Sequence, residues 1–229
     1  MGRYLTGGAA LTWLAIGILA GGCSDAVEKL KSPDRKVVIE AIREIASWDS
    51  ASAAATLTDF GKTQADSVLA IEAVRGIGRI HRDEAAKALA DFAAQGKHPA
   101  VRREAVTQMT YRKDEAFRKL FEQLARTDPD PQVRATAISA ILHFRNLKDV
   151  PLFLELADQE QDDMVQARAV GAVEKLIQVR TAYNPTAPAQ DRQRIIDRLR
   201  RGDPQTGRGS AVDMAAVIQE ERNKASKGK

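Results

Sequence analysis

Residues 128–141, DPDPQVRATAISAI, carry the pattern that decides the fold. Val133, Ala137, Ile138 and Ile141 stand at positions −4, 0, +1 and +4 about the alanine, and such positions share one face of an α-helix. The same alanine, always followed by a β-branched residue, recurs every 32 residues at Ala41, Ala73, Ala105, Ala137 and Ala169. A fixed period of this size predicts stacked supersecondary units rather than one closed globule.

A second apolar series follows 16 residues after each of the first four alanines, with another apolar residue three positions later. Its members are Leu57, Leu89, Phe121 and Phe153. This spacing predicts a second helix in every period, so each repeat is a helical hairpin. One such hairpin cannot bury both of its helices alone, and neighbouring hairpins must therefore stack. The sequence predicts an all-α, right-handed α-solenoid of about five hairpins with a 32-residue period.

Helix start signals precede several of the first helices. Aspartates that can cap a helix, some beside a proline suited to its first turn, occur in 32–34, 128–131 and 162–163. His98-Pro99 is a weaker signal of the same kind. The start signals agree with the hairpin boundaries that the apolar columns give.

The stretch Asp128-Pro129-Asp130-Pro131-Gln132-Val133-Arg134-Ala135-Thr136-Ala137 resembles the HEAT-repeat family in its short, phycobilisome-lyase-type form, and 101–105 is similar to it. The resemblance covers about residues 25–180. It implies a ladder between hairpins, formed by an aspartate before the helix and an arginine after the valine, and only Asp128 and Arg134 supply both. Val38, Ala70 and Gln166 replace the arginine elsewhere. The signature residues of tetratricopeptide and ankyrin repeats are missing.

The beginning of the chain resembles a bacterial export signal. Residues 5–19 are almost wholly apolar, and Leu19-Ala20-Gly21-Gly22-Cys23 reads as a lipobox, in which the cysteine receives a lipid. Cys23 is the only cysteine, which argues against a disulfide or a multi-cysteine metal site. The alternatives are ordinary signal cleavage after Ala20-Gly21-Gly22, giving a soluble exported protein, or a retained anchor helix.

These features predict the domain organisation and the location. We expect a removed signal peptide at 1–22, a lipidated lead-in at 23–31, the solenoid at 32–201, and a loop, capping helix and basic tail at 202–229. An acylated Cys23 predicts anchoring in the cell envelope, at the periplasmic face of the outer membrane if the host has one. The formal net charge of +4 is too balanced to imply a nucleic-acid partner, and export argues against one as well.

Charged residues recur beside the apolar stripe of the first helices. Position −1 has Glu40, Glu72 and Glu104, and position +2 has Arg43 and Arg75. One interpretation is local pairing between residues three apart, worth about 0.2–0.5 kcal/mol per pair on an exposed helix. The other is that these five residues, the Glu/Arg ridge, bind a partner.

The C-terminal part departs from the period. Residues 183–188, YNPTAP, predict a loop, and 191–201 resume as a helix that is strongly basic through Arg192, Arg194, Arg198, Arg200 and Arg201. That basic face either contacts anionic headgroups or an acidic envelope polymer, or is a solvated surface. A further helix at 211–222 is expected to cover the last hairpin, before a disordered tail at 223–229.

Catalytic and metal-binding patterns are missing from the sequence. His81, His98 and His143 occupy different places in their hairpins, none at metal-ligand spacing, and no glycine-rich phosphate loop or nucleophile elbow occurs. We therefore expect no enzyme, metal or cofactor, but a membrane-anchored scaffold that binds another envelope protein. The alternatives are a soluble exported binding protein and an accessory enzyme or ligand-binding protein of lyase-like type.

Overall fold

The computed structural model describes residues 24–202. The signal peptide and the acylation site at Cys23 lie outside the described residues, as do the C-terminal helix predicted at 211–222 and the tail after it. Within the described range, no helix combines the length and apolarity needed to cross a membrane.

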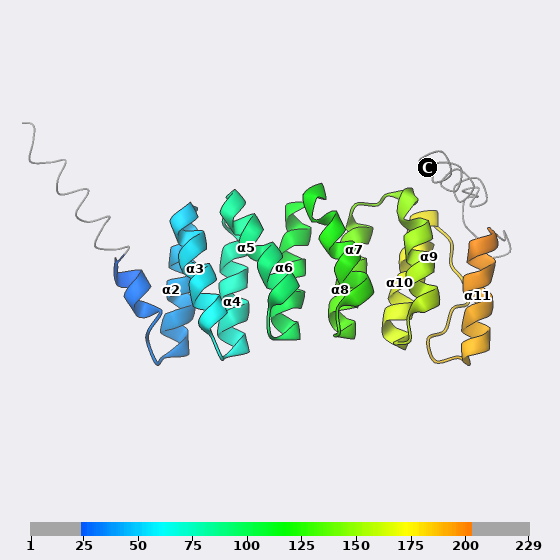
Figure 1. Ribbon diagram of the computed structural model, residues 1–229, viewed down its shortest axis with the longest axis horizontal. Helices are drawn as coiled ribbons and strands as arrows, with labels where there is room; N and C mark the ends of the chain where they lie inside the picture. The colour runs from blue at the N-terminus through cyan, green and yellow to red at the C-terminus, as the bar shows by residue number, and fades with distance from the viewer. Residues whose placement is uncertain (1–23, 203–229) are drawn as a thin grey trace, which may run out of the picture. The chain divides into compact units, whose positions relative to one another are not determined.

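The described chain is a succession of five helical hairpins, which confirms the all-α repeat prediction (Figure 1). The first helices of the hairpins are α2 (Arg35–Ser47), α4 (Ser67–Gly78), α6 (Pro99–Arg112), α8 (Pro131–His143) and α10 (Asp163–Ile177). The second helices are α3 (Ala51–Thr63), α5 (Asp83–Gln95), α7 (Arg118–Thr127), α9 (Val150–Gln159) and α11 (Ala189–Arg201). Short 3₁₀ turns, η1 (Glu115–Phe117) and η2 (Leu147–Asp149), lead into α7 and α9.

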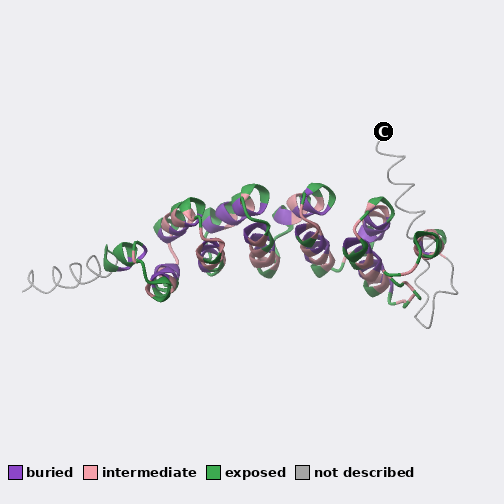
Figure 2. Ribbon diagram, turned by 90° about the horizontal axis from the view of Figure 1, so that it is seen from below, coloured by how far each residue is buried: buried purple, intermediate pink, exposed green. Residues whose placement is uncertain are grey.

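The repeated apolar columns form the core. All five period alanines are at most 1% exposed, and the residues one and four positions after each of them are also buried. Leu57, Leu89, Phe121 and Phe153 of the second helices are fully buried against them. Figure 2 shows these buried sides of the helices in purple and the exposed sides in green. The small alanine side chain lets helices approach closely, while its large neighbours fill the space between hairpins.

The chain divides into two compact units, an N-terminal unit that ends at Phe92 and a C-terminal unit that starts at Ala93. In the N-terminal unit, α4 packs on both α2 and α3. In the C-terminal unit, α8 packs on α6 and α7, α10 packs on α8 and α9, and α11 packs on α9. Within each unit the hairpins therefore stack as in an α-solenoid, with each new first helix resting on the hairpin before it.

Side-chain caps start the first helices where the sequence signals them. Asp34 accepts from the amide of Lys36, and Asp130 and Asp162 each accept from two amides of the first turn. His98 stands at the cap position of α6 but makes no side-chain capping bond there. Asp66 caps α4 in the same way as Asp34, although the sequence analysis did not single it out.

Two glycines set the close packing of the N-terminal unit. A Cβ added at Gly76 would lie 2.9 Å from both Ile42 Cγ2 and Leu57 Cδ1. A Cβ at Gly61 would lie 2.9 Å from Phe92 Cζ. Real Cβ atoms essentially never come so close. A side chain at either position would therefore force its neighbours to shift, and glycine avoids this.

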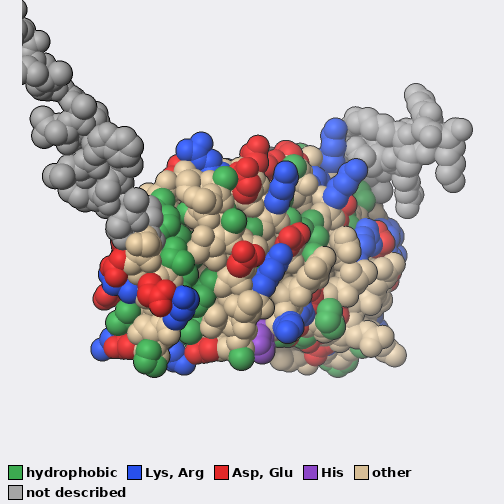
Figure 3. Space-filling model, turned by 60° about the vertical axis from the view of Figure 1, so that its left-hand side comes forward, with side chains coloured by type: hydrophobic (Ala, Val, Ile, Leu, Met, Phe, Trp, Pro, Cys, Tyr) green, Lys and Arg blue, Asp and Glu red, His purple; other side chains and the backbone are tan. Residues whose placement is uncertain are grey.

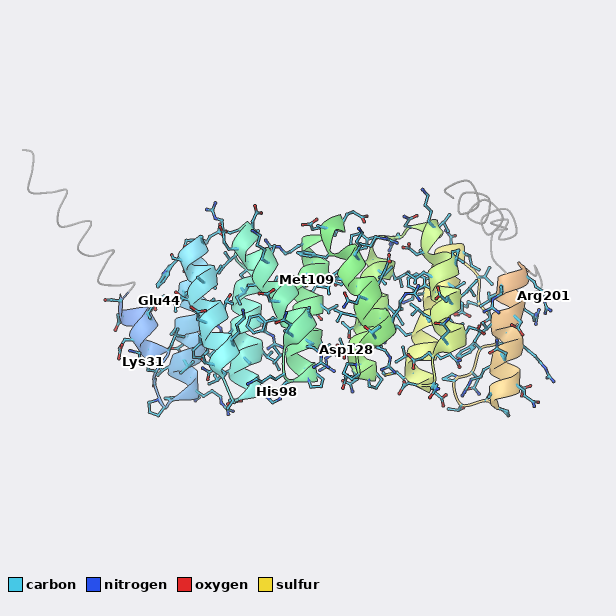
Figure 4. The ribbon with its side chains drawn as sticks, in the orientation of Figure 1. Lys31, Glu44, His98, Met109, Asp128 and Arg201 are labelled. Carbon is cyan, nitrogen blue, oxygen red and sulfur yellow. The ribbon has the colours of Figure 1, made fainter. Side chains whose placement is uncertain are left out.

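The C-terminal unit has an arginine ladder between neighbouring hairpins, as the resemblance implied. Arg134 does not pair with the carboxylate of Asp128. Asp128 accepts two 2.8 Å hydrogen bonds from Arg102 of the preceding hairpin (Figure 4 labels Asp128). Arg134 pairs in the same bidentate way with Glu160, at 2.8 and 2.9 Å. Both rungs join residues 26 positions apart, and Glu160 serves at the position where the resemblance implied aspartate.

The ladder is largely buried. The side chains of Arg102 and Asp128 are 10% and 3% exposed, and those of Arg134 and Glu160 are 16% and 12% exposed. Hydrogen bonds to the carboxylates raise the pKa of both arginines, against the opposing effect of burial. Burial acts to raise the pKa of Glu160, but bonds from Arg134 and from two backbone amides outweigh it and lower that pKa. The next residue in the arginine column, Gln166, donates to the carbonyl of Ala157 and accepts from the Tyr183 hydroxyl.

Candidate protein-interaction surface

The Glu/Arg ridge is only partly exposed: Glu40, Arg43 and Arg75 are exposed, whereas Glu72 and Glu104 are half-buried. In α4, Arg75 donates to Glu72 at 2.7 Å, so the local i,i+3 pairing is confirmed there. Glu40 and Arg43 of α2 are both exposed, and among the described residues they do not form such a pair. Glu104, in the C-terminal unit, accepts from Gln108 at 2.8 Å.

Exposed apolar side chains accompany these charges on the first helices. Val68 in α4 and Met164 in α10 stand at the same repeat position, five residues before the period alanine, and are 43% and 44% exposed. Figure 3 shows acidic, basic and hydrophobic side chains interspersed over the face in view. Exposed apolar side chains of this kind can supply contacts to a partner, and charges around them can orient it.

The arginines of α11 are mostly held by neighbouring groups. Arg192 pairs with Asp163 at 2.8 Å and donates to the carbonyl of Pro185. Arg194 pairs with Asp191, and Arg200 lies 3.1 Å from Asp158. Arg198 also makes an interaction, while Arg201 lies exposed at the end of the helix (Figure 4). This arrangement favours a locally paired, solvated helix face over a headgroup-binding one.

A groove runs along α10, a feature that the sequence analysis missed. It has a volume of about 420 Å³ and is mostly apolar. The apolar lining comes from Leu142 at the end of α8, from Met164, Ala167, Gly171 and Ala172 of α10, and from Pro185 of the loop before α11. Arg168 and Lys175 provide its charged edge. No column of the repeat could have indicated this groove, because Pro185 belongs to the loop that breaks the period.

The histidines lie at turns and helix ends, as predicted. His81 lies between α4 and α5, His98 starts α6 (Figure 4), and His143 ends α8. Among residues 24–202, no group of three or more potential metal ligands comes together. A second, polar hollow of about 610 Å³ is lined by ladder residues, among them Arg134 and Glu160, whose charges already neutralise each other.

The family model for HEAT repeats matches residues 87–174. The match contains most of α5, the whole of α6 to α9 and most of α10, and it therefore includes both rungs of the ladder. Arg168 and Gly171 of the groove lie within the matched residues, whereas the ridge residues Glu40 and Arg43 precede them.

Several solved structures are similar to this chain at low sequence identity. The complex of CpcE and CpcF of phycocyanin lyase from Nostoc sp. PCC7120 is similar to this chain with 19% identity and a TM-score of 0.45, over 77% of this chain and 67% of that one. An engineered protein matches with 20% identity and a TM-score of 0.42, over 90% and 97% of the two chains. A second engineered protein has 20% identity, a TM-score of 0.37 and coverages of 89% and 96%. No curated protein matches this sequence.

Proposed function

We propose that this HEAT-repeat chain is a lipid-anchored scaffold of the bacterial cell envelope, which binds another envelope protein through the exposed face of its first helices. The observation that carries the proposal is the exposure of apolar residues among charges on that face. Val68 remains 43% exposed beside the Glu72–Arg75 pair, although the helix that holds them is packed through its alanine column. A partner gains binding energy by covering Val68, and the charges set its orientation.

The repeat gives this surface rigidity. The buried columns fix α4, α8 and α10 against the hairpin before each of them, so the backbone that carries their exposed side chains is in place before a partner arrives. The face changes along the chain, from charged Glu40 and Arg43 in α2 to Thr136 and Ser139 in α8. The first helices of the two units therefore present different exposed side chains on the same type of helical hairpin.

The anchor in this proposal is Cys23, acylated after removal of residues 1–22. Two or three acyl chains hold a protein stably on a membrane. The scaffold would then meet its partner in the aqueous space beside that membrane.

Membrane fractionation with mass spectrometry of the mature N-terminus tests the anchor. The native chain is expected in the membrane fraction with a diacylated Cys23, and Cys23→Ala is expected to leave that fraction. Ser24→Ala is the matched control, because it changes the adjacent residue and keeps the thiol. A native chain whose N-terminus has no lipid would contradict the anchor and leave a soluble exported scaffold.

A charge exchange tests the binding face. Glu72→Arg combined with Arg75→Glu keeps the local i,i+3 pair and the net charge but reverses both signs at the surface. Crosslinked partner recovered from membranes is expected to fall by about 10-fold, which corresponds to about 1.4 kcal/mol. The control exchanges Lys62 and Asp91, an exposed pair between the second helices α3 and α5. Equal recovery from both exchanged variants would rule out the ridge as a binding site.

A further inference from the structure

The groove along α10 has a mostly apolar lining and free space at its middle. Met164, Ala167, Gly171 and Ala172 of its lining follow one side of α10. Ala167 and Gly171 are half-buried, and Ala172 is buried. A Cβ placed at Gly171 meets no atom within 4 Å, so space remains at the middle of the groove. Met164, at one end, is 44% exposed. Small residues flanked by larger apolar ones form a seat for the apolar side of another helix.

The charges at the edge of the groove have a defined spacing. Arg168 and Lys175 are seven residues apart on α10, a separation of about 10.5 Å along the helix axis. Both side chains are exposed, and neither forms an ion pair with any of the described residues. An occupant with two carboxylates at the same spacing would pair with both arginine and lysine at once.

Residues 211–221, AVDMAAVIQEE, have this composition. With the periodicity of a helix, Met214, Val217 and Ile218 share one face. Asp213 and Glu220 are seven residues apart, which matches the spacing of Arg168 and Lys175. The segment thus combines an apolar stripe for the groove with two acidic side chains for its basic edge.

The connection from Gly202 to residue 211 consists of eight residues. The structure describes the chain to Gly202, directly after α11, and α11 follows the loop whose Pro185 lines the groove. Residues 203–210 can span up to about 26 Å when extended. That exceeds the length of α10 itself, which is about 22 Å for its 15 residues.

We propose that residues 211–221 bind as a helix in the groove formed by α8, α10 and Pro185, with Asp213 and Glu220 paired to Arg168 and Lys175. The groove is then covered by a segment of the same chain. This inference does not depend on the proposed scaffold function or on the lipid anchor. A second copy of the chain and an external protein are the competing occupants.

Disulfide trapping in the full chain tests this contact. Cysteines are placed at Gly171 and Val217 in a Cys23→Ser background, where Gly171 tolerates a side chain without a clash. Under mild oxidation the monomeric disulfide is expected to form at least about 10-fold faster than in a control with cysteines at Gln123 and Val217, because binding raises the effective concentration of the two thiols. Gln123 is an exposed residue of α7 in the same unit. Equal rates would overturn the proposal, and a disulfide between two chains would assign the groove to a second copy.

Charge reversal tests whether the segment binds through the proposed ion pairs or through apolar contacts alone. Arg168→Glu with Lys175→Glu is expected to slow the Gly171–Val217 disulfide by about 3-fold or more. Adding Asp213→Lys and Glu220→Lys to that variant is expected to restore the rate. If neither variant changes the rate at which the disulfide forms, the proposed pairing of these four residues is wrong. Circular dichroism of each variant shows whether the fold is retained.

Discussion

The two units build the same alanine-centred hairpin but bring neighbouring hairpins together in different ways. In the N-terminal unit, Gly76 removes a side chain where Ile42 and Leu57 approach. In the C-terminal unit, the Arg102–Asp128 and Arg134–Glu160 pairs join successive hairpins through buried charges. The equivalent arginine positions of the N-terminal unit hold Val38 and Ala70, which cannot form such a ladder.

This difference shows that the 32-residue period determines the buried core, whereas the contacts between neighbouring hairpins are particular to each hairpin. The alanine column is fully buried in both units, so the repeat spacing fixes the core. The contacts between one hairpin and the next vary. Neighbouring helices can be brought together by a glycine that allows close approach or by a bidentate ion pair between them. The stabilities of the two units should therefore respond to different substitutions.

The largest effect is expected from breaking the buried rung at Arg102. Arg102→Met keeps most of the side-chain stem but leaves the carboxylate of Asp128, 3% exposed, without its partner. A loss of about 3–5 kcal/mol in the free energy of unfolding is expected. Denaturant unfolding gives the size of the loss, and hydrogen exchange should place it in α6 to α8 rather than in α2 to α4.

Arg103→Met is the control for this change, because Arg103 is an exposed residue on the same helix. It should alter stability by less than about 0.5 kcal/mol. If Arg102→Met and Arg103→Met have equal effects, the ladder does not stabilise the C-terminal unit.

A smaller, pH-dependent effect is expected at Glu160. Its pKa is lowered below the ordinary 4.5, so its pairing stabilises the folded chain above about pH 4.5 and loses that effect as the pH falls through the folded-state pKa. Glu160→Gln should cost about 1.5–3 kcal/mol at pH 7. The stability gap between this variant and the native chain should shrink below pH 4.5.

Glu155→Gln serves as the matched comparison. Its pKa is lowered chiefly by the hydrogen bond from Arg126, but the Glu155 side chain is 44% exposed. Solvent weakens that pair, so the cost should stay within about 1 kcal/mol. A gap at Glu160 that does not change with pH would mean that its charge is not the source of the stabilisation.

The N-terminal unit should be most sensitive at its glycines. Gly76→Ala favours the helix by about 0.5–1 kcal/mol but forces a methyl group against Ile42 and Leu57, which costs about 1–3 kcal/mol. We expect a net loss of about 0.5–2 kcal/mol, measured by thermal unfolding. An increase in stability would show that the hairpins of this unit are not held at the close distance described.

The smallest effect has the opposite sign. Gly171→Ala makes the same chemical change in α10, where the new methyl group meets no atom within 4 Å. Only the helix preference remains, so the free energy of unfolding should rise by about 0.5–1 kcal/mol. A loss of stability here would mean that the groove is closed at Gly171 in solution.

The sequence was sufficient to predict the hairpins but only part of their contacts. The alanine column and the residues around it indicated the buried faces correctly because the period imposes the same surroundings each time. The resemblance implied a ladder between hairpins, but the partner of each arginine could not be read from a single repeat. The acceptor lies 26 residues after the arginine, and in the second rung Glu160 stands in place of aspartate. The groove depends on where Pro185 places a loop that follows no period, and no local pattern encodes that path.

Site-specific photocrosslinking in intact cells tests most directly whether the first helices hold the partner. Photoreactive residues are introduced at Arg43 and Arg103 on first helices, and at the exposed Ala55 and Lys119 on second helices. The account predicts that the same envelope protein is crosslinked from Arg43 and Arg103 and not from the other two positions. Crosslinks from Ala55 and Lys119 alone, or no protein adduct at any of the four positions, would contradict it.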